Sequence, residues 1–513
     1  MRKEKQGNQR EKEKNKLEMK ILETMKSKIM QRIIAMKRIY LFMLLATFIY
    51  SCDRPSPSRI DFDYQLDWGG DRICVALNYL PTHRGFDTLY YGSLDFGGQS
   101  DIFGCVKNLT VVGAEFVADS ANRVLILDVK SLKPIQIHYD IASHLPNDNL
   151  NCPMEMFRPN ISSDFIYCHG INLFFRHADS DTTIATQRVS WGKRPDFSLF
   201  CMYHPADAFE TVTGDATDFH STLLVGDRDL NIDTITVCNA LNYVVTAPRK
   251  NVQYNRQSIK EYFAKFYSGI VKFWEEDTLD SYSLVVYPFE KIPFNASGTG
   301  LNNGFCSRYD AAADTILTES RINLFSHEIG HNWISSDMDN QWFGEGFNEF
   351  QTIYMLVATG IEPTQSFVDY LNNSMEKLHH SKIRNMPNDS ISIRFWELGD
   401  YSWIPYWRGL VYAFRLWGQM EHATGNVHCY KEMMHALKGS THEMTKDVFI
   451  LVVSKFIDRQ QLEDEFEKYI MRAETMVLDA DQLPAGCRLN HKNDGTPFIE
   501  IADDEEFREH FVL

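Results

Sequence analysis

The hydrophobic pattern of this 513-residue chain changes its period near residue 246, and that change restricts the folds open to it. From about residue 60 to 245, short segments alternate apolar and polar residues between clusters of Gly, Pro, Asn and Asp. Examples are Ile73–Leu80, Val124–Val129 and Ile135–Tyr139. A period of two predicts antiparallel strands with one buried face. In the last of these segments, Ile135, Ile137 and Tyr139 are expected to face one side of the sheet, and Gln136 and His138 the other.

After Pro248 the apolar residues recur every three to four positions, which is the period of one helical face. Ser258 is a candidate N-cap for a helix whose apolar face would contain Ile259, Phe263, Phe266, Ile270 and Phe273. A strand is expected at Tyr282–Tyr287, a Gly/Asn-rich turn at Gly298–Gly304, and helices to about Ala473. The pattern therefore predicts an α+β fold, with a β-rich domain followed by a mainly helical region.

The first 52 residues form a basic leader with a net charge of +8. Met36-Lys37-Arg38 precedes an apolar run, Ile39–Tyr50, which is shorter than the roughly 20 residues that a transmembrane helix needs. This arrangement is typical of a secretory signal peptide, with Met30 or Met36 as the expected initiator. An ordinary signal peptide that leaves no anchor, or a short membrane anchor, remains the alternative.

The end of the leader, Phe48-Ile49-Tyr50-Ser51-Cys52, resembles a loose bacterial lipobox. The resemblance implies that Cys52 is lipidated and holds the protein at a membrane surface outside the cytoplasm. Residues 53–59, which contain two prolines, would then form a short tether.

The rest of the chain is acidic, with a formal charge of −25 within a total of −17. Nucleic acid is therefore excluded as a partner, because binding to its phosphates needs a basic surface. The ten cysteines contain no C-x-x-C pair, which excludes a zinc ribbon and a thioredoxin-like motif, and their spacing does not reveal any pairing.

The segment His327-Glu328-Ile329-Gly330-His331 contains candidate metal ligands and a candidate catalytic carboxylate. On a helix, His327 and His331 lie one turn apart on the same face, so both imidazoles can reach one metal ion. Glu328 lies beside them, where it can hold the attacking water. H-E-x-x-H is the signature of mononuclear zinc hydrolases, and it predicts one Zn²⁺ ion per chain.

A third zinc ligand is expected shortly downstream, in Trp342–Phe350. Glu345 is the candidate, and Gly344 and Gly346 would let the chain turn tightly into a second helix. Glu349 lies four residues later on the same face, where it could orient a ligating histidine. The alternative is that Glu349, or both carboxylates, are ordinary solvated charges.

H-E-x-x-H followed by an E-G-F helix resembles the gluzincin metallopeptidases, of the aminopeptidase N type and of the glycyl-aminopeptidase type that often carries a PDZ domain. The resemblance implies a β-sandwich or saddle domain at residues 60–245, a thermolysin-like zinc peptidase domain at 246–425, and a helical C-terminal region and cap at 426–513. We expect no PDZ domain. The stretch between His331 and Glu345 is shorter than is usual in these families.

Two further segments match these families. Pro405-Tyr406-Trp407-Arg408-Gly409 resembles their P-Y-x-K-G segment, which implies that Tyr406 stabilises the oxyanion, with Arg408 where lysine is usual. Thr299–Asn303 stands where they carry an edge strand that binds the substrate backbone, implying that Gly300, Leu301 and Asn302 contact substrate. Asn302 replaces the glutamate that grips the substrate's amino terminus.

The sequence therefore predicts a zinc-dependent peptidase in which a metal-activated water attacks a peptide bond and Glu328 acts as general base. Its partners would be a peptide or protein substrate and, through Cys52, a membrane surface. Aminopeptidase action is the family expectation, whereas Asn302 leaves room for an endopeptidase. A catalytically silent surface lipoprotein that binds peptide or glycan is the competing hypothesis from another class of protein. An adhesive or structural lipoprotein in which the motif is accidental is a third hypothesis.

Overall fold

The computed structural model describes residues 60–92, 101–144, 158–177, 185–192, 197–202, 211–247, 256–289, 296–301, 303–310, 317–335, 341–397, 399–438 and 444–513. Residues 60–513 form one compact unit. The signal peptide, the tether, Cys52 and Asn302, about which the sequence makes predictions, lie outside the described residues. Of the helices within the described ranges, none is both long enough and apolar enough to cross a membrane.

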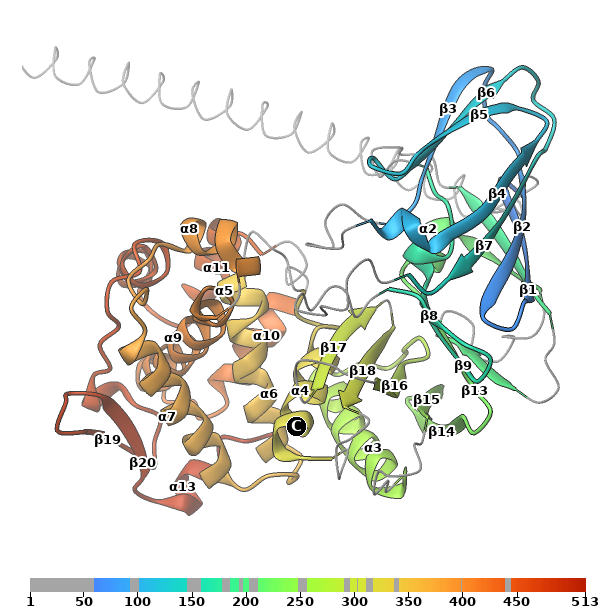
Figure 1. Ribbon diagram of the computed structural model, residues 1–513. Coiled ribbons are helices and arrows are strands. Elements are labelled where there is room, and N and C mark those ends of the chain that lie inside the picture. Colours follow the sequence, from blue (N-terminus) through green and yellow to red (C-terminus); the bar gives the residue numbers. More distant parts are fainter. Residues whose placement is uncertain are drawn as a thin grey trace, which may run out of the picture. The chain divides into compact units, whose positions relative to one another are not determined.

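The first half of the compact unit is built from strands, as the alternating pattern predicts (Figure 1). Its largest sheet has the order β12 (Thr211–Asp215), β10 (Thr186–Trp191), β1 (Phe62–Trp68), β2 (Arg72–Tyr79), β7 (Ile135–Ala142), β4 (Val106–Val112). A second sheet comprises β3 (Gly85–Tyr90), β6 (Val124–Val129) and β5 (Glu115–Asp119). A third comprises β11 (Ser198–Cys201), β13 (Leu223–Asp227), β9 (Phe165–His169) and β8 (Asn160–Ile161). The short helix α2 (Ala216–His220) precedes β13.

Strand β7 shows the predicted alternation directly. Ile135, Ile137 and Tyr139 are buried, whereas Gln136 and His138 between them are exposed. The described pairings of this half are antiparallel, apart from the parallel pair β1–β10. The predicted antiparallel β-rich half is therefore confirmed.

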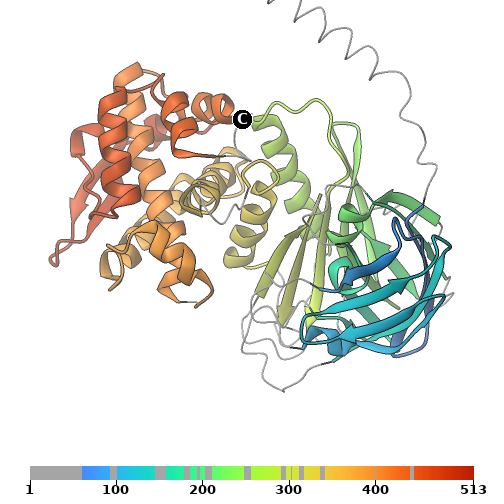
Figure 2. The ribbon, with the colours of Figure 1, turned by 90° about the horizontal axis from the view of Figure 1, so that it is seen from above.

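A five-stranded sheet connects this half to the helices. Its order is β14 (Asn231–Val237), β15 (Ala240–Thr246), β16 (Ser283–Phe289), β18 (Gly304–Asp310), β17 (Ala296–Leu301). Its alternate residues enter two different cores, as the pleat requires. Leu284 and Val286 of β16 pack with the helices, whereas Val285 and Tyr287 pack with β9 and β13. Figure 2 shows this sheet between the helices and the first three sheets.

The predicted domain boundary at residues 245–246 falls at the end of β15, and the sheet continues across it. Strands β14 and β15, which the sequence pattern assigns to the first domain, belong to the same sheet as β16, which pairs in parallel with β15. The second boundary, at 425–426, follows the last residue of α9 at Thr424. Because residues 60–513 form a single compact unit, both boundaries stay predictions.

The second half is mainly helical. Its longer helices are α3 (Arg256–Phe273), α4 (Glu319–Gly330), α6 (Gly346–Ala358), α7 (Thr364–His380) and α9 (Asp400–Thr424). The shorter ones are α5 (Gln341–Gly344), α8 (Asn388–Arg394), α10 (Cys429–Leu437), α11 (Lys446–Val453), α12 (Arg459–Glu465) and α13 (Asp504–Arg508). A hairpin of β19 (Cys487–His491) and β20 (Pro497–Ile501) precedes α13.

Two local predictions were wrong. Helix α3 begins at Arg256, so Ser258 lies inside the helix instead of capping it. The Gly/Asn-rich segment predicted as a turn forms most of β17. A Cβ on Gly298 would lie 2.2 Å from ring carbons of Phe305 on β18, so this glycine is needed for close packing across the strand pair. Of the described residues in this segment, Asn303, directly before β18, lies in a turn with a positive φ of 53°.

Candidate metal centre

Helix α4 and its last turn position the two histidines. Their rings lie 4.7 Å apart and nearly perpendicular. Nδ1 of His331 lies 2.9 Å from the carbonyl oxygen of Ile334. Because a carbonyl only accepts, Nδ1 of His331 carries the proton and its Nε2 keeps a free lone pair. The main chain of His327 is held by Asn348, whose Nδ2 donates to the His327 carbonyl at 2.7 Å.

Glu345 lies between α5 and α6, and its carboxylate points toward both imidazoles. Oε2 of Glu345 is 3.1 Å from Nε2 of His327 and 3.5 Å from Nε2 of His331. One donor atom from each of the three residues lies within 4.8 Å of the others. Ligands at zinc distances in a tetrahedron are about 3.3–3.6 Å apart, so this donor set fits one zinc ion. All three side chains are buried or half-buried.

Two glycines allow Glu345 to reach this position. A Cβ on Gly346 would lie 2.3 Å from Cα of Gly409, and a Cβ on Gly409 would lie 2.0 Å from the carbonyl oxygen of Trp342. Helices α5 and α6 therefore contact α9 backbone to backbone. The sequence predicts that Gly346 allows a tight turn, but this glycine lies within α6 and is needed for the close approach.

Glu349 lies one turn after Glu345, on the far side of His327. Its Oε2 is 2.5 Å from Nδ1 of His327. The hydroxyl of Tyr370 on α7 donates to its other oxygen. Glu349 is buried. It is therefore not a free helix charge, and its contacts are those of a group that orients a ligating histidine.

The imidazoles and carboxylates of this cluster shift one another's pKa values. Burial opposes protonation of His327, but the carboxylates of Glu349 and Glu345 outweigh it and raise the pKa of this histidine well above its ordinary value. Burial would raise the pKa of Glu345, but the two histidines hold it below the ordinary range. The arrangement therefore favours an ionised Glu345 and attracts positive charge to the point between the three side chains.

Glu328 lies between this cluster and β17. Its carboxylate accepts a hydrogen bond from the main-chain N–H of Gly300, and burial raises its pKa against the opposing charges of His331 and His327. A Cβ on Gly300 would lie 3.5 Å from Oε2 of Glu328, so β17 passes directly beside the carboxylate. Within the described residues, β17 pairs only with β18 and is the last strand of the sheet. Gly300 and Leu301 thus lie on an edge strand, as the family resemblance implied.

Tyr406 reaches the cluster from α9. Its ring lies 5.3 Å from that of His327 and is tilted by 27°. Burial, followed by the charges of Glu345 and Glu328, raises the pKa of Tyr406 well above its ordinary value, so the hydroxyl keeps its proton. Arg408, two residues further along the helix, donates instead to Asn388 and to the main-chain carbonyls of residues 384 and 386.

The structure thus brings together the predicted His327, His331, Glu345, Glu349, Glu328, Gly300 and Tyr406. Two contributors were missed. Asn348 has a local signal, because it follows Glu345 by three residues on the helix that carries the third ligand. Tyr370 has none, because it comes from another helix and its role depends on packing.

No protein-family model and no curated protein matches this sequence. Solved structures do match it. The aminopeptidase N family protein from Idiomarina loihiensis superimposes with a TM-score of 0.68 at 14% identity, over 84% of this chain and 79% of that chain. A mutant M1 zinc metallopeptidase from Deinococcus radiodurans, bound to a Tyr-Ser-Ala substrate, gives a TM-score of 0.51 at 13% identity, over 82% of this chain and 95% of that chain.

This likeness shows that the chain has the fold of the aminopeptidase N family and M1 zinc metallopeptidases. The predicted fold class is confirmed, and so is the resemblance to the gluzincin architecture. Within that fold, the described residues hold the His-His-Glu group that the resemblance implied.

Proposed function

We propose that this protein is a zinc-dependent peptidase whose single metal ion is held by His327, His331 and Glu345. The supporting observation is the donor set itself: two imidazole Nε2 atoms and one carboxylate oxygen converge from two helices. Glu349 behind His327 adds the carboxylate–histidine contact that is usual behind a zinc ligand. Bound zinc would supply a Lewis acid that polarises the scissile carbonyl and acidifies a water molecule.

The chain's own residues supply the proton transfers. Glu328 would accept a proton from the attacking water and pass it to the leaving amine. The protonated hydroxyl of Tyr406 would donate to the oxygen that becomes negative in the transition state. The N–H groups and carbonyls along the outer edge of β17 would hold the substrate backbone extended beside Glu328.

We infer aminopeptidase action as the leading specificity, in line with the fold. The mutant M1 structure above is bound to a Tyr-Ser-Ala substrate. An aminopeptidase would also have to bind the free amino terminus of its substrate. Asn302 offers no negative charge for that terminus, so another group would have to bind it. Endopeptidase action on the same scaffold is the alternative that this substitution favours.

The decisive experiment incubates residues 53–513, loaded with zinc, with a peptide mixture that contains free and acetylated amino termini. New ends are read by mass spectrometry. Trimming of free termini alone would establish an aminopeptidase, and internal cuts an endopeptidase. Bound zinc without any cleavage would instead favour a silent peptide- or glycan-binding protein.

Matched variants separate catalysis from folding in that experiment. Glu328→Gln should retain zinc and lose most activity, because the amide cannot accept the proton. Glu319→Gln is the same substitution on an exposed residue at the start of α4 and should behave like the parent. Equal turnover by both variants would remove Glu328 from the mechanism.

We propose further that the mature protein is a lipoprotein anchored through Cys52 outside the cytoplasm, on the basis of the leader sequence. Expression with labelled palmitate should label the protein and place it in the membrane fraction. Cys52→Ser should abolish both. Label retained in Cys52→Ser, or its absence from the parent, would rule out this anchor.

A further inference from the structure

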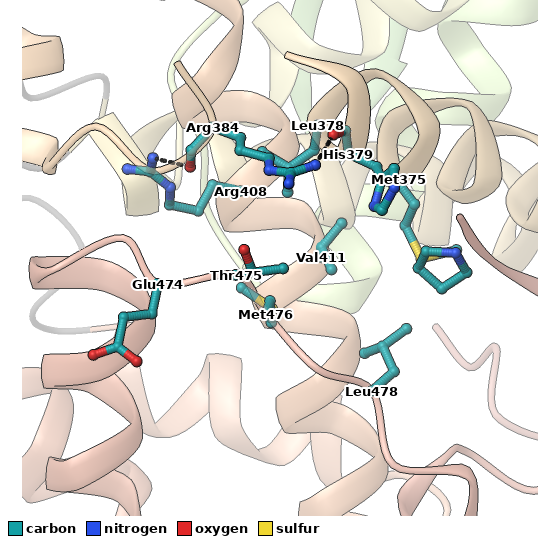
Figure 3. A pocket seen from close by; sticks show the side chains of 11 residues that line it. Met375, Leu378, His379, Arg384, Arg408, Val411, Glu474, Thr475, Met476 and Leu478 are labelled. Atoms are coloured by element: carbon teal, nitrogen blue, oxygen red, sulfur yellow. Dashed lines mark hydrogen bonds between the residues drawn. The ribbon is translucent and has the colours of Figure 1, made fainter. Parts of the chain in front are cut away.

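A second pocket lies away from the metal centre, between α7, α9 and the segment 474–478 (Figure 3). Its cavity volume is about 50 Å³, and its mouth is open to solvent. Its apolar walls come from Met375, Leu378, Val411, Met476 and Leu478. Its polar side contains Arg384 and Arg408, which Figure 3 shows along one wall.

Arg408 is a buried cation without a counter-charge. Only 2% of its surface is exposed. Its guanidinium donates to Oδ1 of Asn388 and to the carbonyl oxygens of Arg384 and Met386, the latter two at 3.0 and 2.8 Å. These acceptors are neutral, and among the described residues Arg408 forms no ion pair. Burial accordingly lowers its pKa to about 10. The three hydrogen bonds leave two of the five guanidinium N–H groups uncommitted.

Arg384 adds a second positive charge to the lining of this pocket. Its guanidinium donates to the carbonyl of His379, and it too forms no ion pair within the described residues. The one carboxylate that lines the pocket, Glu474, is exposed and lies 2.9 Å from Arg472. Among the described residues, no carboxylate forms an ion pair with either arginine of this pocket. An unpaired charge is costly in a buried site.

This pocket is distinct from the metal centre, although both lie against α9. Residues two apart on a helix point about 200° away from each other, since each residue turns by about 100°. Tyr406 stacks on His327, and Arg408 therefore points to the other side of the helix. Val411, one turn after Arg408, extends the pocket side of α9.

We propose that this pocket binds a small organic monocarboxylate with an apolar tail, whose carboxylate contacts Arg384 and Arg408 and whose tail packs among Val411, Met476 and Leu478. A guanidinium matches a carboxylate in shape and charge. The apolar walls disfavour a multiply charged anion such as phosphate, because they would leave its other oxygens without partners. The carboxylate can come from a free short-chain acid or from the C-terminus of a peptide.

Calorimetry on zinc-loaded residues 53–513 tests this proposal with two pairs of compounds. Hexanoate and hexanamide represent a free acid and its uncharged counterpart. N-acetylleucine and N-acetylleucinamide represent a peptide C-terminus and its counterpart. We expect saturable binding of one or both acids and at least 10-fold weaker binding of the matching amide. The acid that binds more tightly identifies the source of the carboxylate.

Variants locate the binding. Arg384 is half-buried, so Arg384→Gln should fold, keep zinc and weaken binding of the acid at least 10-fold. Arg384→Lys should restore part of the affinity. Met476→Trp, which fills the pocket, should abolish binding without altering the melting temperature in the absence of ligand by more than a few degrees. These readouts do not depend on peptidase activity, so they stand or fall separately from the proposed function.

Three results would overturn the proposal. Equal binding of acid and amide would make the pocket merely apolar. Unchanged binding by Arg384→Gln, with loss on removal of zinc, would place the acid at the metal. No binding of either acid at millimolar concentration would leave the arginines with a purely structural role.

Discussion

Oε2 of Glu349 lies 2.5 Å from Nδ1 of His327, on the opposite side of the imidazole from the Nε2 atom that faces Glu345. A carboxylate at Nδ1 keeps the proton on that nitrogen and leaves the lone pair of Nε2 for a metal ion. The hydroxyl of Tyr370 holds the carboxylate from the other side. Three helices, α4, α6 and α7, thus fix the orientation of one ligand.

Glu349→Gln should weaken zinc binding roughly 10- to 100-fold, because the amide no longer increases the basicity of His327. The measurement is competition with a fluorescent zinc chelator. Glu376→Gln on α7 is the control, since Glu376 is half-exposed and pairs only with Lys492 among the described residues. Equal zinc affinities for the two variants would show that Glu349 does not support the metal site.

Tyr406→Phe should lower kcat roughly 100- to 1,000-fold with little change in KM and none in zinc content, because the lost hydroxyl acts mainly in the transition state. Steady-state kinetics on the best substrate of the peptide mixture provides the measurement. Tyr401→Phe, on the same helix but stacked on Arg394, should keep the parent values. A change confined to KM would give Tyr406 a binding role.

Local spacing made the metal centre predictable from the sequence. His327, Glu328 and His331 lie within one turn at the end of α4, and Glu345 and Glu349 lie four residues apart at the start of α6, so each of these two groups spans only a few residues. The period of the apolar residues likewise predicted the β-rich half and the helical half. Both signals depend on neighbours in the chain.

Relations between distant segments were not predictable. The glycines of β17 read as a turn because composition cannot show that Phe305 lies across the strand pair. The contact of Tyr370 with Glu349 joins two helices, and the pocket around Arg408 is formed by segments that lie far apart in the sequence. Nothing near these residues in the sequence indicates either arrangement. The sequence predicts a domain boundary near residue 246, where the period of the apolar residues changes. It does not show that β15, before this position, pairs with β16 after it.

Gly409→Ala should destabilise the protein by roughly 1–3 kcal/mol or more, despite the higher helix propensity of alanine. The new methyl group would lie 2.0 Å from the carbonyl of Trp342 and 2.6 Å from Cα of Gly346, and neither backbone atom can move without separating α5 and α6 from α9. Because Glu345 lies at that junction, zinc affinity should fall as well. Urea unfolding of the zinc-free protein measures the stability loss.

Gly269→Ala in α3 is the matched comparison, because the three atoms nearest to its Cβ belong to the side chains of Thr359 and Leu513, the closest being a methyl of Thr359 at 2.3 Å. The Thr359 side chain can rotate at the cost of its hydroxyl's hydrogen bonds to the carbonyls of Met355 and Leu356, without separating two helices. The loss should therefore be smaller than in Gly409→Ala, and zinc affinity unchanged. Similar losses in the two variants would contradict the close contact of α6 with α9.

His169 should make the protein less stable in mild acid. It is 1% exposed, its Nε2 lies 2.8 Å from the hydroxyl of Tyr167, and burial, followed by the charge of Arg308, lowers its pKa from 6.5 to about 3. The unfolded chain therefore binds a proton below pH 6.5 that the folded chain does not bind until about pH 3. Stability from this group is complete above pH 6.5 and falls as the pH decreases toward 3, by up to about 1.4 kcal/mol per pH unit.

His169→Gln should remove that dependence, because the amide can still accept the hydroxyl of Tyr167 and does not titrate. Urea unfolding at about pH 7.5 and pH 5 gives the free energy of unfolding for each protein. The parent should lose about 2 kcal/mol more than the variant between the two values, since about 1.5 pH units lie below the pKa of the unfolded histidine. The exposed His83, replaced by Gln, serves as the control and should follow the parent. Parallel losses in the parent and in His169→Gln would mean that His169 is protonated in the folded protein at pH 5, and that burial does not exclude the charge.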